Sequence, residues 1–227
     1  MAEATFIFWL QAGAMHLFGI NEFAARFPNA LVGVATLLVL FYLGNKLYDR
    51  SFGLLWALVY AGSILPHFTL RPVLFDPLFN LFIFLSVYQL ANLSQSSDHR
   101  QRLGFAAWGG VFIGAAVLTK GPVALLLVGV CGLVYWVLSR RLNTFQIGEL
   151  LLYAFLAFVV SSLWYLPETL RNGFWFINEF LEYQIGLAAV SEDTAHEQPF
   201  WYHPVVLFVW LFSGESVLFG GFAKRLV

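Results

Sequence analysis

A lysine interrupts the stretch GAAVLTKGPVALLL, residues 114–127, which is otherwise apolar enough to cross a membrane. A charge at the centre of a bilayer costs about 2.5–3.5 kcal/mol on insertion scales, so a lysine kept there usually has a function. Lys120 precedes Gly-Pro. Proline has no backbone N–H and disfavours helical geometry in the residue before it, so we expect the helix to end and the chain to turn here. An ammonium held at this turn could bind an anion at headgroup level, such as a lipid-borne phosphate. A lysine that snorkels to the surface without a ligand is the alternative.

A second charged turn is predicted at LRPVLFDPLFN, residues 70–80, where Arg71 and Asp76 each precede a proline. The two side chains could form an ion pair that holds the turn together. In the functional interpretation, Asp76 is a catalytic carboxylate that acts as a base, as a metal ligand or as the group that orients one. Arg71 would then join Lys120 in binding the phosphate of a donor.

Glu22 and Arg26 are candidates for the wall of a polar chamber that would also contain Lys120 and Asp76. They stand four residues apart just before Pro28, a spacing that favours a helical ion pair and the start of a helix. A purely structural ion pair is the favoured interpretation of these two residues.

The segment HEQPFWYHP, residues 196–204, is a candidate lid because it places His196, Tyr202 and His203 directly before an apolar run. An aromatic belt at the membrane surface would explain the aromatic residues without any further function. The two histidines lack the HxxxH or HxH spacing of a metal site, so the metal content is unknown. No cofactor is certain from the sequence, and a divalent metal is the one cofactor that we consider possible.

The composition is that of an integral membrane protein. Of the 227 residues, 60% are hydrophobic and only 11% are charged, whereas about a quarter are charged in soluble domains. The formal net charge of -1 gives no reason to expect a nucleic acid partner, and membrane lipids are the expected surroundings. Lipid offers no hydrogen-bond partners to the backbone, so the apolar runs must be helices. We therefore predict an all-α polytopic helical bundle that forms a single transmembrane domain over residues 1–227.

The bundle should contain about seven transmembrane helices, because seven apolar runs have the roughly 17–25 residues that a bilayer requires. They cover residues 28–45, 52–70, 73–93, 103–119, 121–138, 148–166 and 204–222. The stretch 5–20 is shorter and contains Gln11 and His16, so we expect a short interfacial helix at the N-terminus. Residues 167–203 are predicted to form one large external loop.

The basic residues indicate which side of the membrane each loop faces. With the N-terminal stretch outside, one set of loops holds Lys46, Arg50, Arg100, Arg102, Arg140, Arg141, Lys224 and Arg225. The other set holds only Arg26, Arg71, Lys120 and Arg171. Cytoplasmic loops carry the excess of positive charge, so the second set is predicted to be external. All the candidate site residues then face the outside.

The order of the motifs resembles a known family. WLQAGAMHLFGINEFAARFPNALVG, RPVLFDPLFN, GAAVLTKGPVALLL and HEQPFWYHPVVL follow one another as in the C-type glycosyltransferases, in the branch of bacterial aminoarabinose transferases and protein O-mannosyltransferases. The resemblance implies an enzyme of the bacterial inner membrane that takes a sugar from a polyprenyl-phosphate donor at the outer, periplasmic leaflet. The acceptor would be a lipid, a glycan or a protein. Asp76 matches the second acidic residue of the family, and Lys120 lies in its LTKGP turn.

The chain also departs from the family pattern. Family members begin with one more span and an external loop that carries an acidic pair, the expected general base, followed by Lys-Pro-Pro. Here residues 1–5, MAEAT, stand in that place, and the family chain continues past residue 227. We therefore expect a fragment of the family domain. Two other functions stay open from the residues themselves: a lipid or solute transporter or flippase, and a non-catalytic membrane fragment.

Overall fold

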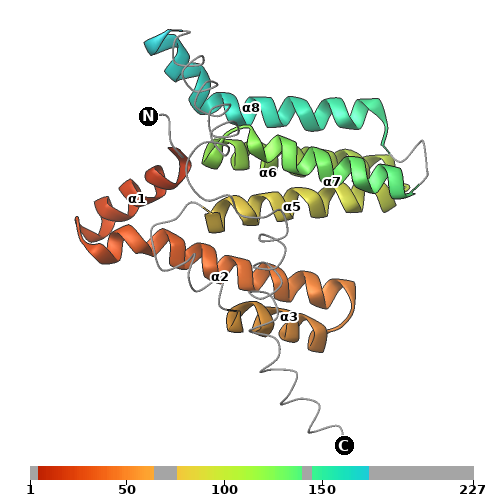
Figure 1. The fold of residues 1–227 in the computed structure, drawn as a ribbon, viewed down its shortest axis with the longest axis horizontal. Helices are drawn as coiled ribbons and strands as arrows, with labels where there is room; N and C mark the ends of the chain where they lie inside the picture. Colours follow the sequence, from red (N-terminus) through yellow and green to blue (C-terminus); the bar gives the residue numbers. More distant parts are fainter. Residues whose placement is uncertain (1–4, 64–75, 140–144, 174–227) are drawn as a thin grey trace, which may run out of the picture. The chain divides into compact units, whose positions relative to one another are not determined.

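The computed structural model describes residues 5–63, 76–139 and 145–173, and every regular element among them is a helix (Figure 1). The helices are α1 (Thr5–Phe18), α2 (Glu22–Leu47), α3 (Arg50–Gly62), α5 (Asp76–Gln95), α6 (His99–Lys120), α7 (Val123–Ser139) and α8 (Ile147–Asn172). The predicted all-α class is confirmed for the described part of the chain.

Four of these helices, α2, α5, α6 and α8, are long and apolar enough to cross a membrane. They correspond to the predicted spans 28–45, 73–93, 103–119 and 148–166. Helix α7 has 17 residues, at the lower limit for a span, and α3 has 13; neither is among the four. The predicted span 204–222 lies outside the described residues. The described helices thus confirm a polytopic membrane bundle but not the predicted number of seven spans.

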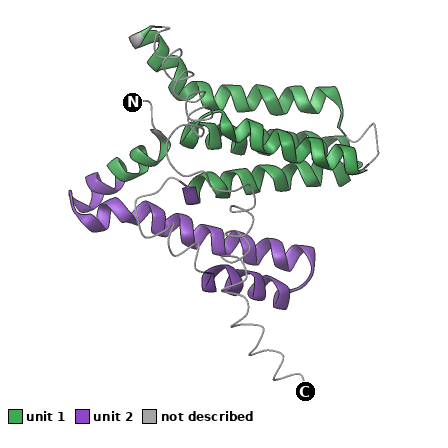
Figure 2. Ribbon diagram, viewed as in Figure 1, with its two compact units in different colours: residues 1–13, 78–191 green, residues 14–77, 192–227 purple. Residues whose placement is uncertain are grey.

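Contacts divide the chain into two compact units, shown in green and purple in Figure 2. Unit 1 takes in residues 1–13 and 78–191, and unit 2 takes in residues 14–77 and 192–227. The described residues of unit 2 are mainly α2 and α3. Those of unit 1 are the first part of α1 and almost all of α5 to α8.

In unit 2, α2 and α3 form a tight helical hairpin. Asn21 caps α2 through a 2.7 Å hydrogen bond from the Ala24 N–H, so the helix begins at Glu22. Pro28 therefore lies inside α2, not in its first turn as the sequence pattern suggested. At the other end of the hairpin, a Cβ on Gly53 would lie 2.5 Å from the Phe41 carbonyl oxygen, so only glycine allows this approach.

In unit 1, α5 to α8 run alongside one another except where the C-terminal end of α8 bends away (Figure 1), and α6 packs against both α7 and α8. The contact between α6 and α8 depends on glycine. A Cβ on Gly110 would lie 2.5 Å from the Tyr153 carbonyl oxygen, and one on Gly114 would lie 2.7 Å from the Val160 Cβ. Small residues at such an interface let helix backbones pack closely, which drives helix association in membranes.

A buried serine joins α5 to this pair of helices. The hydroxyl of Ser86 donates to the Gly109 carbonyl oxygen at 3.0 Å and shares a 2.6 Å hydrogen bond with the Tyr153 hydroxyl. Ser86 is fully buried, so its hydroxyl must find partners within the protein. It links α5, α6 and α8 at one point.

A buried ion pair fixes α6 to α8 near the N-terminus of each helix. Arg102 Nε and Nη2 donate to the two carboxylate oxygens of Glu149, the second at 2.6 Å. Arg102 also donates to the Ser96 carbonyl oxygen, and Glu149 accepts from the Gln146 N–H. The sequence pattern placed Arg102 in a loop, and this was wrong, because Arg102 is a residue of α6. Its side chain lies within the bundle because Glu149, 1% exposed, neutralises it there.

The glycine contact predicts that Gly110→Ala destabilises the protein while Gly104→Ala on the same helix does not. The added methyl at 110 must push α6 and α8 apart, whereas a Cβ at 104 meets nothing within 4 Å. We expect a loss of about 1–3 kcal/mol at 110, typical of overpacking. Unfolding in detergent micelles would measure both variants, and equal midpoints would contradict the close contact.

The ion pair predicts that either single variant, Arg102→Met or Glu149→Leu, is less stable than the double variant that carries both changes. A single change leaves a buried charge without its partner, at a cost of about 3–5 kcal/mol. The double variant replaces the pair by apolar side chains and should recover most of that loss. A double variant as unstable as the sum of the two single variants would show that the two side chains do not interact.

Candidate functional site

The predicted turn at Lys120 is present. Helix α6 ends at Lys120, and Gly121 follows with a φ of 87°, a left-handed conformation that favours glycine. The Gly121 N–H donates to the Val117 carbonyl oxygen at 2.8 Å and so closes the last turn of α6. Helix α7 begins at Val123, directly after Pro122. Lys120 is thus exposed at the C-terminal end of α6, where a helix dipole favours a positive charge.

Two other helices fix the end of α6. The ammonium of Lys120 lies over the ring of Phe79 in α5, 5.6 Å from the ring centroid. The Tyr165 hydroxyl of α8 donates to the Val117 carbonyl oxygen at 3.5 Å. Both the side chain and the backbone near Lys120 are therefore held by neighbouring elements of unit 1.

Aromatic rings gather near the same end of unit 1. Phe82 of α5 packs edge to face on Phe6 of α1, Phe6 on Trp9, and Trp9 on Trp164 of α8, with ring centroids 5.3–6.1 Å apart. Trp9 keeps 42% of its surface exposed. Tryptophan is enriched at membrane–water interfaces, so this row of rings is typical of the headgroup level.

Asp76 is the first residue of α5 and is half-buried. A negative charge in the first turn of a helix interacts favourably with the helix dipole. Phe79, which contacts Lys120, follows three residues later on the same helix. Asp76 therefore lies at the N-terminal end of α5, where the helix dipole favours a negative charge.

Glu22 and Arg26 form the predicted ion pair, one turn apart at the start of α2. Their side chains are 77% and 58% exposed, so the pair adds little to stability and is open to solvent. The remaining predicted site residues, Arg71, His196, Tyr202 and His203, lie outside the described residues. Within the described ranges no group of three or more His, Cys, Asp or Glu side chains could hold a metal ion.

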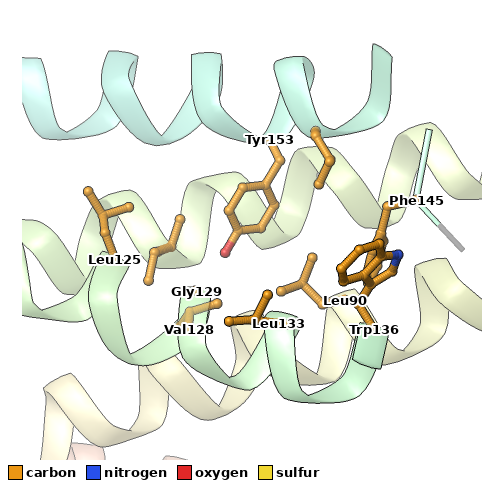
Figure 3. A pocket seen from close by; sticks show the side chains of 11 residues that line it. Leu90, Leu125, Val128, Gly129, Leu133, Trp136, Phe145 and Tyr153 are labelled. Carbon is orange, nitrogen blue, oxygen red and sulfur yellow. The ribbon is translucent and has the colours of Figure 1, made fainter. Parts of the chain in front are cut away.

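An apolar cavity of about 410 Å³ lies among α5, α6, α7 and α8 (Figure 3). Leu90, Val128, Leu133, Trp136 and Tyr153 are among its lining residues, and none of the lining residues is charged. The Tyr153 hydroxyl already shares a hydrogen bond with Ser86. The cavity therefore suits an aliphatic chain better than a sugar.

The sequence pattern did not single out three residues that hold α6 in place, namely Phe79 and Tyr165 near Lys120 and Glu149 at the other end of the helix. Glu149 had a detectable signal, because Gln146 and Glu149 form a capping box at the start of α8. Phe79 and Tyr165 are single aromatic residues in apolar runs, and nothing in the sequence marks their contacts.

Comparison with known proteins places these features in a family. Residues 3–165 match the family described as dolichyl-phosphate-mannose-protein mannosyltransferase. The undecaprenyl phosphate-alpha-4-amino-4-deoxy-L-arabinose arabinosyl transferase of Pectobacterium carotovorum is 30% identical over 96% of this chain. Its counterpart in Pseudomonas fluorescens is 30% identical over 88% of the chain. The chain spans only 40% and 35% of the length of these two relatives.

The crystal structure of ArnT from Cupriavidus metallidurans in the apo state is similar to this structure. Its TM-score is 0.72 at 20% identity, and the match covers 92% of this chain and 38% of that protein. A second crystal structure of the same protein, bound to undecaprenyl phosphate, gives a TM-score of 0.70 over 80% of this chain. At this identity the likeness shows the fold. With a match over well over half of its length, the chain belongs to the dolichyl-phosphate-mannose-protein mannosyltransferase family of membrane glycosyltransferases.

Proposed function

We propose that this chain is part of a membrane glycosyltransferase that takes a sugar from a polyprenyl-phosphate donor and transfers it to a lipid, glycan or protein acceptor. Family membership supports the reaction class. The single structural observation that supports the donor is Lys120, an exposed cation held at the end of α6 by Phe79. A fixed ammonium at a helix end is suited to bind the phosphate of a lipid.

The reaction would be a single displacement at the anomeric carbon. A carboxylate accepts the proton of the acceptor hydroxyl, and the hydroxyl oxygen forms a bond to the anomeric carbon. The bond from that carbon to the phosphate oxygen breaks, and polyprenyl phosphate leaves with the electron pair. Lys120, joined by Arg71, would stabilise the charge that develops on the departing phosphate. Asp76 is the carboxylate that we assign to the catalytic chamber.

The active face would be the outer, periplasmic face of the inner membrane. Lys120 and the buried Arg102 lie 18 residues apart in α6, or about 27 Å along the helix axis. Arg100 belongs to the Arg102 end of α6, and in the sequence Arg140 and Arg141 directly follow Ser139, the last residue of α7. The excess of positive charge at that end favours the cytoplasm there and the outside at Lys120.

The proposal predicts that Lys120→Met strongly reduces sugar transfer. Removing one group that stabilises transition-state charge commonly lowers kcat by about 10²–10³. The measurement is the transfer of labelled aminoarabinose from its undecaprenyl-phosphate donor to lipid A. It would be made in membranes that contain the whole glycosyltransferase of which this chain is proposed to be a part. Lys46→Met, at the C-terminal end of α2, is the matched control and should keep normal turnover. Normal turnover in Lys120→Met would contradict the assignment.

Asp76→Asn should lower kcat with little change in KM for the donor, because the neutral amide can neither accept the proton of the acceptor nor orient the group that does. The control is Asp98→Asn, since Asp98 caps α6 and asparagine caps helices equally well. Steady-state kinetics on both variants would separate a chemical role from a structural one. An Asp76→Asn enzyme with the kcat of the unmodified protein would exclude Asp76 from the chemistry.

A further inference from the structure

The contact between Lys120 and Phe79 joins an exposed side chain to a buried one. Phe79 is 5% exposed and belongs to the apolar core that Ile113, Val117 and Ala157 also form. Its ring is therefore fixed by packing. The Lys120 Nζ lies 5.6 Å from the ring centroid, within the roughly 6 Å over which the face of a ring attracts a cation.

The backbone at Lys120 is held by contacts that do not involve Phe79. Hydrogen bonds from Gly121 and Tyr165 to the Val117 carbonyl oxygen fix the last turn of α6. The ring of Phe79 acts instead on the Lys120 side chain, and an unrestrained lysine side chain has many rotamers. A side chain that is already restricted loses less entropy when it binds a ligand.

We propose that Phe79 is a positioning residue, whose ring holds the Lys120 ammonium ready to bind the phosphate of the lipid donor; this rests on the proposed function. An ammonium donates hydrogen bonds to phosphate oxygens, and a ring face can attract the same cation. The quadrupole of the ring attracts the cation, but the ring has no net charge and does not neutralise the ammonium. Ring and phosphate thus bind the ammonium together.

Fluorinated phenylalanines at position 79 test this proposal without changing the shape of the core. One, two and three fluorines weaken the negative face of the ring stepwise. The affinity of the chain in nanodiscs for undecaprenyl phosphate should fall stepwise too, by roughly two- to fivefold in total. Undecaprenol, which lacks the phosphate, should show no such trend. Phe79→Tyr should keep the affinity, and Phe79→Leu should lower it.

Phe82 provides the matched control because it lies on the same helix and packs against Phe6. The same fluorinated series at position 82 should leave the affinity unchanged, and thermal unfolding should be the same across both series. A flat series at 79, in a protein where Lys120→Met weakens binding, would overturn the positioning role and leave the proposed function standing. If Lys120→Met also binds normally, the phosphate-binding role of Lys120 and the positioning role of Phe79 both fail.

Discussion

The close contact between α6 and α8 is the constraint on which the rest of unit 1 depends. It is fixed at three levels: by Arg102 and Glu149 near the N-terminal ends, by glycines in the middle, and by Tyr165 with the Val117 carbonyl oxygen near Lys120. In lipid no hydrophobic effect drives helices together, so close packing and hydrogen bonds must do so. The position of Lys120 follows from this contact, because the residue ends the helix that α8 holds.

The positively charged residues at the two ends of α6 have different roles, because Arg102 is buried and Lys120 is exposed. Arg102 is buried, and the bidentate ion pair with Glu149 together with the Ser96 carbonyl oxygen occupies its donors. Such a side chain stabilises the fold and is closed to a ligand. Lys120 is exposed, and its ammonium lies over the ring of Phe79. At its end of α6, Lys120 is therefore a cation that a substrate can reach.

Much of the local structure could be predicted from the sequence, because its causes are local. Gly-Pro after Lys120 predicted the end of α6, and the spacing of Glu22 and Arg26 predicted their ion pair. The start of α2 was misplaced because Asn21, not Pro28, sets it. The pair of Arg102 and Glu149 and the contact of Phe79 with Lys120 could not be predicted. Each joins residues from helices whose facing sides only the packed structure defines.

The central claim is that Lys120 contacts the phosphate of a polyprenyl-phosphate lipid. The most direct measurement is a ¹⁵N–³¹P dipolar coupling by solid-state NMR, with ¹⁵N-labelled lysine side chains and undecaprenyl phosphate in bilayers. The chain has lysines only at positions 46, 120 and 224, so Lys120→Met identifies the signal. We predict a coupling that corresponds to direct contact and that disappears in Lys120→Met. The absence of coupling at Lys120 with the lipid bound would contradict the account.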